Sequence, residues 1–157
     1  MDFKGLKEKQ RKLDSYIGES KNIDMSKHVL DRNKALQVEF NEFINEVPEL
    51  FKYWSNKKMK RDAALEEFVD GIHFLISLSN DLGVEDYTYT EPFNKDIESI
   101  VLRINYKIST LLWTKDFKSL MDDYMFLGYY LGFTDEDIEQ FYEQKNQENY
   151  NRQNNGY

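Results

Sequence analysis

Residues 62–82 read DAALEEFVDGIHFLISLSNDL and are followed by Gly83. Apolar side chains recur through this stretch at helical spacing, and glycine is the residue that most often follows the end of a helix. We therefore expect a long helix over residues 62–82. Glu67 and Asp70 are three residues apart, so they share a face of this helix with Phe74. Carboxylates at the border of an apolar face need an explanation, because a buried charge requires a partner.

The remainder of the chain has the same helical periodicity. It predicts five further helices, over residues 2–17, 28–47, 96–113, 115–131 and 135–150. Thr134 and Asp137 have the spacing of a capping box at the start of the last one. We expect a polar connector at 18–27 and a single domain over 1–150, followed by a flexible tail at 151–157 that orders over a substrate. With seven Gly and two Pro in 157 residues, the sequence favours an all-α bundle of about five to six helices.

Composition and charge exclude several classes of protein. The aromatic content of 15% argues against a disordered chain, and the absence of Cys excludes disulfides and thiolate metal sites. A net charge of −8 disfavours binding to nucleic acid. No apolar run approaches the roughly 20 residues of a membrane span, and the N-terminus lacks a signal-peptide core. We expect a cytoplasmic protein with no nucleic-acid or membrane partner.

A second acidic pair repeats the spacing of the first. Glu39 and Glu42 lie on the preceding predicted helix, also beside apolar side chains, and we find no Arg or Lys on the same faces. Buried carboxylates without a cation must take a proton or bind a metal. Four carboxylates from two antiparallel helices suit Mg²⁺, which prefers oxygen ligands and keeps waters that phosphates can replace. The structural alternative is two solvated helix faces, since a single Glu-x-x-Glu is common by chance.

Several short segments share the pattern of one enzyme family. The chain reads VEFNEFINE at 38–46, FKYWS at 51–55 and LEEFVDGIHF at 65–74, with 24 residues between Glu42 and Glu67. It reads KNQENYNR at 145–152 and closes on Gly156-Tyr157. Together with a weaker match at 6–14, these segments resemble the dimeric, all-α dUTPases, which belong with the MazG-type all-α NTP pyrophosphohydrolases.

The resemblance implies an activity and a cofactor. It implies hydrolysis of dUTP, and of dUDP, to dUMP with release of pyrophosphate or phosphate by a metal-activated water in a homodimer. Glu39, Glu42, Glu67 and Asp70 would hold two or more Mg²⁺ ions over the phosphates. Glu42, with Glu39 beside it, would position or deprotonate the attacking water.

The resemblance also implies polar contacts to the nucleotide. Lys145 and Arg152 would meet phosphate oxygens, for which the planar guanidinium of Arg is well suited. Asn149 and Gln10 would each present a donor and an acceptor to the uracil edge. Asp14 would lie beside the base, where some members of the family have Asn, and this difference affects the expected uracil contacts.

Two aromatic residues complete the expected site. Trp54 would flank the nucleotide, and Phe74 would press on the sugar and exclude a 2′-hydroxyl. Each has a simpler interpretation as a core aromatic residue. His73, between Asp70 and Phe74, is expected to be a packed or surface histidine and not a catalytic one.

Two alternatives to a dUTPase remain open at the level of sequence. A related NTP pyrophosphohydrolase with another base preference, such as a dCTP or house-cleaning enzyme, would share the acidic pattern. A non-catalytic helical interaction protein would keep only the bundle, although the four acidic positions argue against it.

Overall fold

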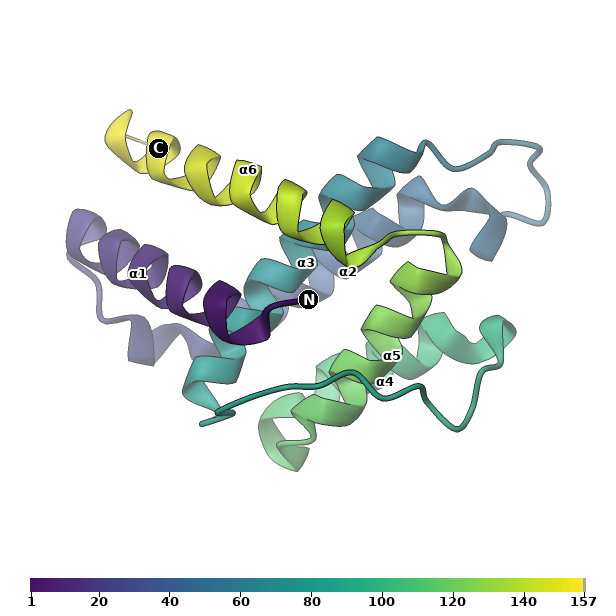
Figure 1. Ribbon diagram of the computed structural model, residues 1–157, viewed down its shortest axis with the longest axis horizontal. Helices are drawn as coiled ribbons and strands as arrows, with labels where there is room; N and C mark the ends of the chain where they lie inside the picture. The colour runs from purple at the N-terminus through teal and green to yellow at the C-terminus, as the bar shows by residue number, and fades with distance from the viewer. Residues whose placement is uncertain (157) are drawn as a thin grey trace.

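The computed structural model describes residues 1–156, and within them the chain is all-α with no strand (Figure 1). The six helices are α1 (Phe3–Lys21), α2 (Val29–Glu46), α3 (Arg61–Asp81), α4 (Ile97–Thr114), α5 (Phe117–Tyr130) and α6 (Asp135–Asn154), with 3₁₀ turns η1 (Met25–His28) and η2 (Pro48–Leu50). The predicted all-α class and number of helices are confirmed. None of the helices in this part of the chain combines the length and apolar character needed to cross a membrane.

Helix α1 is longer than predicted. The sequence places a connector from residue 18, but the helix continues to Lys21 and ends at Asn22, whose φ is 54°. Gly18 is buried inside the helix, where the chain folds back over it: a Cβ there would lie 3.2 Å from the carbonyl oxygen of Ile23. This glycine therefore permits a close approach of the backbone and does not end the helix.

Helix α6 also extends past its predicted end. The capping box of Thr134 and Asp137 is present, as predicted, but the helix continues to Asn154 and includes part of the segment assigned to a flexible tail. Its last turns lie against α1, where the rings of Tyr16 and Tyr150 are 5.1 Å apart and the Tyr16 hydroxyl donates to Asn154. Contacts between the two ends of the chain therefore order these residues, while Tyr157 lies outside the described part.

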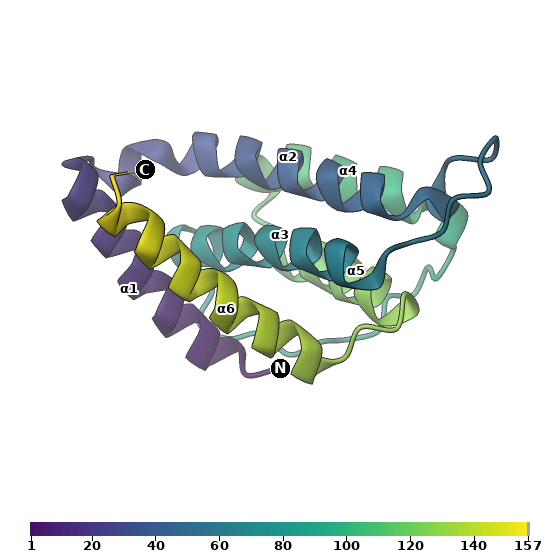
Figure 2. The ribbon, with the colours of Figure 1, turned by 90° about the horizontal axis from the view of Figure 1, so that it is seen from above.

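Helix α3 forms the centre of the bundle (Figure 2). It lies between α2 on one side and α1 and α6 on the other, and most of its side chains are buried. Phe68 packs edge-on against Phe43 of α2, with ring centroids 5.2 Å apart, and stacks on Tyr124 of α5 at 4.7 Å. The acidic residues of α3 thus belong to a helix that is held from all sides.

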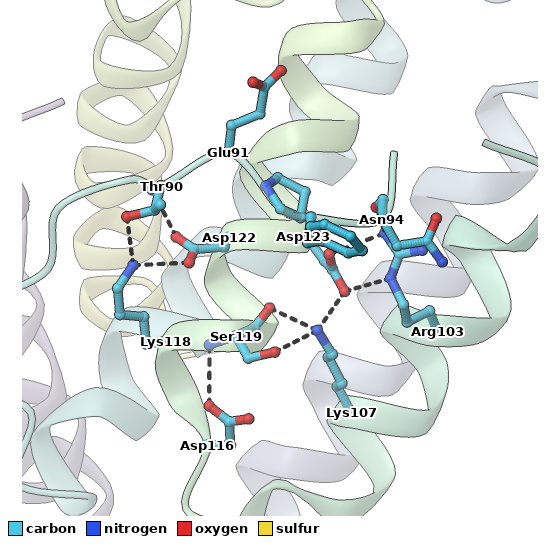
Figure 3. Close-up of a pocket in the computed structure, with 12 residues that line it drawn as sticks. Thr90, Glu91, Asn94, Arg103, Lys107, Asp116, Lys118, Ser119, Asp122 and Asp123 are labelled. Carbon is cyan, nitrogen blue, oxygen red and sulfur yellow. Dashed lines mark hydrogen bonds and ion pairs between the residues drawn. The ribbon is translucent and has the colours of Figure 1, made fainter. Parts of the chain in front are cut away.

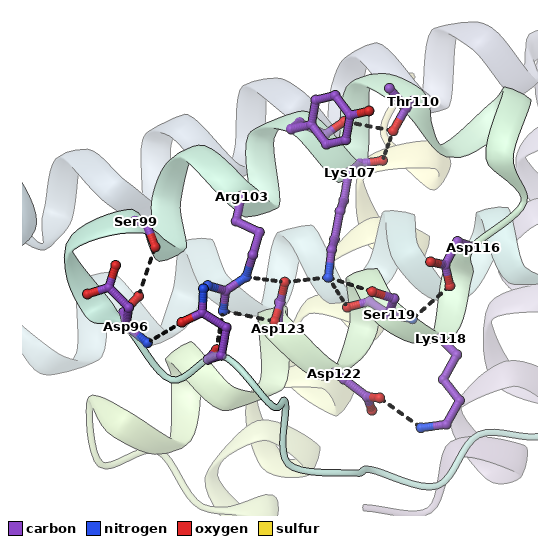
Figure 4. A network of polar contacts seen from close by, with 12 residues as sticks. Asp96, Ser99, Arg103, Lys107, Thr110, Asp116, Lys118, Ser119, Asp122 and Asp123 are labelled. Atoms are coloured by element: carbon purple, nitrogen blue, oxygen red, sulfur yellow. Dashed lines mark hydrogen bonds and ion pairs between the residues drawn. The ribbon is translucent and has the colours of Figure 1, made fainter.

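A buried ion-pair network joins α4 to α5 (Figure 4). Asp123 is 1% exposed and accepts hydrogen bonds from Arg103 Nε at 2.8 Å and Lys107 Nζ at 2.5 Å. Lys107 also donates to the hydroxyl of Ser119 at 2.5 Å. The two cations offset the cost of burying the carboxylate, so the network fixes the α4–α5 hairpin.

Removing the buried charge should destabilise the hairpin. We expect Asp123→Asn to lower the free energy of unfolding by about 3 kcal/mol, because Arg103 and Lys107 lose their shared counter-charge in a partly buried site. Urea denaturation followed by circular dichroism measures this loss. Asp116→Asn is the matched control: it is exposed, and Asn also serves as an N-cap, so a change below about 1 kcal/mol is expected. Equal losses in both variants would contradict the role of the network.

Candidate active site

Three carboxylates from α2 and α3 meet in the structure. One oxygen each from Glu39, Glu67 and Asp70 lies within 4.8 Å of the others, and all three side chains are partly buried. We refer to these three residues as the acid cluster. Glu67 and Asp70 share a face because they are one helical turn apart, and the packing of α2 on α3 brings Glu39 to the same face. The sequence-based expectation that the two acidic pairs converge is thus met by three of the four residues.

The carboxylates of the acid cluster repel one another. Burial, and then the charges of Asp70, Glu42 and Glu67, raise the pKa of Glu39 to about 7. The pKa values of Glu67 and Asp70 are raised as well, in both cases mainly by burial. Carboxylates with raised pKa values hold negative charge at a cost that a cation would remove. The donor set, which consists of oxygen atoms alone, fits a hard divalent ion such as Mg²⁺.

Glu42 lies at the edge of the acid cluster and not within it. Its side chain is exposed and, with Glu67, lines a shallow surface pocket of about 540 Å³ next to Val38, Asn41 and Asn45. We call this the outer pocket. Glu42 still acts electrostatically on the cluster, since its charge raises the pKa values of Glu39 and Glu67.

Lys145 pairs with the acid cluster from α6. Its ammonium group lies 2.8 Å from Glu66 and 2.9 Å from Asp70, and its side chain is 11% exposed. Burial alone would lower the pKa of Lys145, but the hydrogen bonds to Glu66 and Asp70 outweigh it and the pKa is raised. The acid cluster therefore has one cation already, supplied by another helix. A contact between Lys145 and a substrate phosphate remains a prediction. It would require the ammonium group to be shared between that phosphate and the carboxylates of Glu66 and Asp70.

A second, more enclosed pocket adjoins the acid cluster and is lined mainly by residues of α1, α2, α3 and α6. Its volume is about 360 Å³, and we call it the inner pocket. The predicted site residues that line it are Gln10, Asp14, Glu39, Asp70, Phe74, Asn149 and Arg152. Residues separated by more than 130 positions thus meet in one cavity. Arg152 also pairs with Glu148 at 2.6 Å.

Gln10 is held in one orientation by its neighbours. Its amide oxygen accepts hydrogen bonds from the Tyr142 hydroxyl at 2.6 Å and from His73 Nδ1 at 2.8 Å, and its amide nitrogen donates to Asp14 at 2.8 Å. Because an amide oxygen only accepts, His73 must donate from Nδ1. Burial lowers the pKa of His73 to about 3, so the ring is neutral. His73 is a packed residue, stacked on Tyr142 at 3.8 Å.

Asp14 continues this network toward α2. It accepts a hydrogen bond from the Ser77 hydroxyl at 2.7 Å, and Arg32 donates to the same hydroxyl at 2.7 Å. Arg32 also pairs with Asp81 at 2.8 Å. Burial raises the pKa of Asp14, against the opposing effect of the hydrogen bonds from Ser77 and Gln10.

Arg32 and Ser77 were not predicted as site residues from the sequence. Both line the inner pocket. Arg32 precedes Glu39 by seven residues and Ser77 follows Asp70 by seven, so helical periodicity places each on the face of its acidic residue. The expectation that no Arg or Lys shares a helix face with the acidic pairs is therefore wrong for α2. The seven-residue spacing of Arg32 and Glu39 is the sequence signal that identifies Arg32.

Trp54 is not among the residues that line either pocket. Its ring is 66% exposed and packs edge-on against Tyr53, with centroids 4.9 Å apart. The segment that joins α2 to α3 lies at the end of the bundle opposite the C-terminus (Figure 2). The structure does not bring Trp54 to the other predicted nucleotide-binding residues.

A further cavity lies outside the candidate site, and its charged side chains pair with one another. It measures about 550 Å³ and opens between α4, α5 and the segment at residues 90–94 (Figure 3). Its lysines are already paired: Lys107 with Asp123, and Lys118 with Asp122 at 2.8 Å. None of the predicted site residues lines it. The acid cluster and the inner pocket are therefore the candidate active site.

The chain combines an all-α bundle with three carboxylates that meet beside the inner pocket, and this set of oxygen donors fits a divalent cation. A family model described as dUTPase matches residues 2–157, and the chain belongs to this dUTPase family. It is thus a dUTP diphosphatase, an enzyme that hydrolyses dUTP. No curated protein and no solved structure matches the chain. The wider relation to MazG-type enzymes stays a prediction.

Proposed function

We propose that the chain hydrolyses dUTP, and also dUDP, to dUMP in a magnesium-dependent reaction, as a cytoplasmic homodimer. The observation that carries this proposal is the acid cluster, in which three carboxylate oxygens lie within 4.8 Å of one another, and two of its residues, Glu39 and Asp70, line the inner pocket. Half-buried carboxylates whose pKa values are raised gain stability when a cation neutralises them.

The acid cluster would hold the metal. Glu39, Glu67 and Asp70 are the proposed ligands, and Glu42 at the edge completes the set from the outer pocket. When bound, Mg²⁺ neutralises phosphate charge and lowers the pKa of a bound water. The exposed carboxylate of Glu42 would accept a proton from the attacking water, which is the work of a general base.

Two cations of α6 would bind the phosphates. Arg152 lines the inner pocket, and its pairing with Glu148 at the surface is of a kind that a more highly charged phosphate can replace. Lys145 lies beside Asp70, so its ammonium group would bridge the metal ligands and a phosphate oxygen. Both contacts depend on the last turns of α6, which would also position the tail over the substrate.

The base would lie at the α1 end of the inner pocket. Gln10 uses its oxygen and one N–H within the network, which leaves one N–H as a donor in a fixed direction. A fixed donor matches the O4 acceptor of uracil and opposes the amino group of cytosine. The amide of Asn149, with no hydrogen-bond partner among the described residues, would adapt to the rest of the uracil edge. Phe74 would cover the sugar.

A panel of nucleotides assayed for pyrophosphate and phosphate release tests this function. With Mg²⁺ we expect turnover of dUTP and dUDP, at least 10³-fold slower turnover of dCTP and dTTP, and complete loss after EDTA that Mg²⁺ restores. A preference for dCTP would establish a related pyrophosphohydrolase instead. Turnover of dUTP that survives EDTA would contradict the metal site, and no turnover of any nucleotide would favour a non-catalytic interaction protein.

A further inference from the structure

The α1 end of the inner pocket has a carboxylate in its wall. Asp14 lines the pocket, and its side chain is 15% exposed, so a ligand in the pocket can reach it. Gln10 lies directly beside it, because the amide nitrogen of Gln10 is 2.8 Å from one oxygen of Asp14. A hydrogen-bond donor and a charged acceptor are thus neighbours on the same wall.

This pair of groups distinguishes the two pyrimidines of the uracil type and the cytosine type. Uracil has an oxygen acceptor at position 4 next to the N3–H donor, whereas cytosine has an amino donor next to an N3 acceptor. An ionised carboxylate only accepts, and the bonds from Gln10 and Ser77 use two of its roughly four lone-pair sites. An ionised Asp14 beside Gln10 therefore matches both neighbouring atoms of uracil and opposes both of cytosine.

Protonation of Asp14 would change this selection. A neutral carboxyl group has one O–H donor and an oxygen that still accepts. Its O–H can donate to N3 of cytosine, while its other oxygen can still accept from N3–H of uracil. The proton therefore removes the opposition to cytosine, and the preference for uracil depends on the charge of Asp14.

Groups on several helices set that charge. Burial raises the pKa of Asp14, while hydrogen bonds from Ser77 and Gln10 and the charge of Arg32 lower it. Asp81 raises it, because it is a second carboxylate near the site. Arg32 keeps its own charge at every pH of interest. The other titratable or charged groups around this pocket are Glu39, Asp70, His73, Tyr142, Tyr150 and Arg152.

The guanidinium of Arg32 is fixed close to Asp14. Its side chain is 9% exposed, and Nη1 lies 3.8 Å from Oδ2 of Asp14. Arg32 donates to the Ser77 hydroxyl at 2.7 Å and to the carbonyl oxygen of Met25 at 3.0 Å, and it pairs with Asp81 at 2.8 Å. The same Ser77 hydroxyl donates to Asp14 at 2.7 Å. Arg32 therefore acts on Asp14 through its charge and through the orientation of this hydroxyl.

We propose that Arg32 is a positioning residue that holds Asp14 as a charged acceptor for N3–H of uracil, and that the preference for uracil over cytosine therefore falls as the pH falls. Arg32 acts through Asp14 and needs no contact with the nucleotide. The inference rests on the proposed function and specifies which charge in the inner pocket selects the base.

Calorimetric titration with non-hydrolysable nucleotides tests the inference on the full chain. The probes are the imido analogues of dUTP and dCTP, in which N–H replaces the oxygen between the α- and β-phosphates, with Mg²⁺ from pH 8 to pH 5. We expect the ratio of the two Kd values to favour dUTP at pH 8 and to fall by at least about tenfold toward pH 5, because a proton favours the dCTP complex. Titration of the phosphates and of the acid cluster affects both probes alike and cancels in the ratio.

Three variants separate the roles of the residues. In Asp14→Asn the ratio should vary by less than about threefold over the same pH range, since no charge titrates. Arg32→Gln should move the midpoint of the pH dependence to higher pH, because Asp14 loses a cation. Asp81→Asn is the matched control: it alters the same ion pair but removes a negative charge, so the midpoint should move to lower pH. Damage to the fold alone would not move the two midpoints in opposite directions.

Each result decides one part of the inference. A ratio independent of pH in the wild type, wild-type pH dependence in Asp14→Asn, or no binding of either analogue overturns the role of Asp14. An unchanged midpoint in Arg32→Gln overturns the role of Arg32, and if that variant does not fold, the midpoint of Asp81→Asn decides instead. A pH-dependent preference in a protein that turns over no dUTP supports the inference and refutes the proposed function, whereas turnover with a constant ratio refutes the inference alone.

Discussion

Glu39→Gln is expected to lower kcat/KM for dUTP by at least about 10³-fold while making the metal-free protein more stable. Glu39 is the α2 residue of the acid cluster, and burial together with its acidic neighbours raises its pKa to about 7. Glutamine keeps the shape of the side chain but removes a charge that a divalent ion requires. The same change relieves repulsion within the cluster, with a gain in unfolding free energy on the order of 1 kcal/mol after screening by solvent.

The gain in stability should depend on pH. The pKa of Glu39 rises from 4.5 in the unfolded chain to about 7 in the folded one, so the folded state binds the proton more tightly. Below pH 4.5 the carboxyl group is protonated in both states and the wild type carries no penalty. As the pH rises from 4.5 through 7, folding must increasingly accommodate an unfavourable charge. The advantage of Glu39→Gln should therefore appear across this interval and level off above it.

Urea denaturation in EDTA at several pH values measures the stability, and a pyrophosphate assay with Mg²⁺ measures the activity. Glu19→Gln is the control, because Glu19 is an exposed residue of α1 and should change neither quantity. A Glu39→Gln variant that is less stable than the wild type at every pH would mean that the carboxylate has a structural role. Retained turnover would remove Glu39 from the metal ligands.

The acid cluster was predictable because its signal is local. Glu67 and Asp70 share a face through the helical period alone, and the equal spacing of Glu39 and Glu42 marks a second helix of the same kind. The convergence of Glu39 on α3 follows once two apolar faces must pack together. The all-α class was predictable for the same reason, since each helix has its own periodicity.

Arg32 and Ser77 were missed despite a local helical spacing, whereas other missed features depend on contacts between distant parts of the chain. Lys145 meets Asp70 only because α6 packs on α3, and the sequence contains no pattern that links the two positions. The extension of α6 to Asn154 depends on α1 in the same way. Trp54 was expected near the nucleotide through family resemblance, and nothing in its own segment specifies where the loop points.

Gln10→Met is expected to lower kcat/KM for dUTP by about 10²-fold and to narrow the preference for dUTP over dCTP by at least about tenfold. Methionine has a similar length but no N–H, so uracil O4 loses its donor. Cytosine has an amino group at the same position, which the N–H of Gln10 opposes in the wild type. Loss of the donor therefore removes a favourable contact with dUTP and an unfavourable contact with dCTP. The ratio of the kcat/KM values for the two nucleotides measures both effects.

The control for this prediction is Tyr142→Phe. It removes one of the two donors to the oxygen of Gln10 but keeps the ring that stacks on His73, and the hydrogen bond from His73 still fixes the amide. We therefore expect its preference for dUTP to stay within about threefold of the wild type, a change of less than 1 kcal/mol. If Gln10→Met folds and keeps the full preference, another residue reads the base, and the free amide of Asn149 becomes the next one to test. If Tyr142→Phe relaxes the preference as much as Gln10→Met does, the orientation of Gln10 depends on the whole network and not on its own N–H alone.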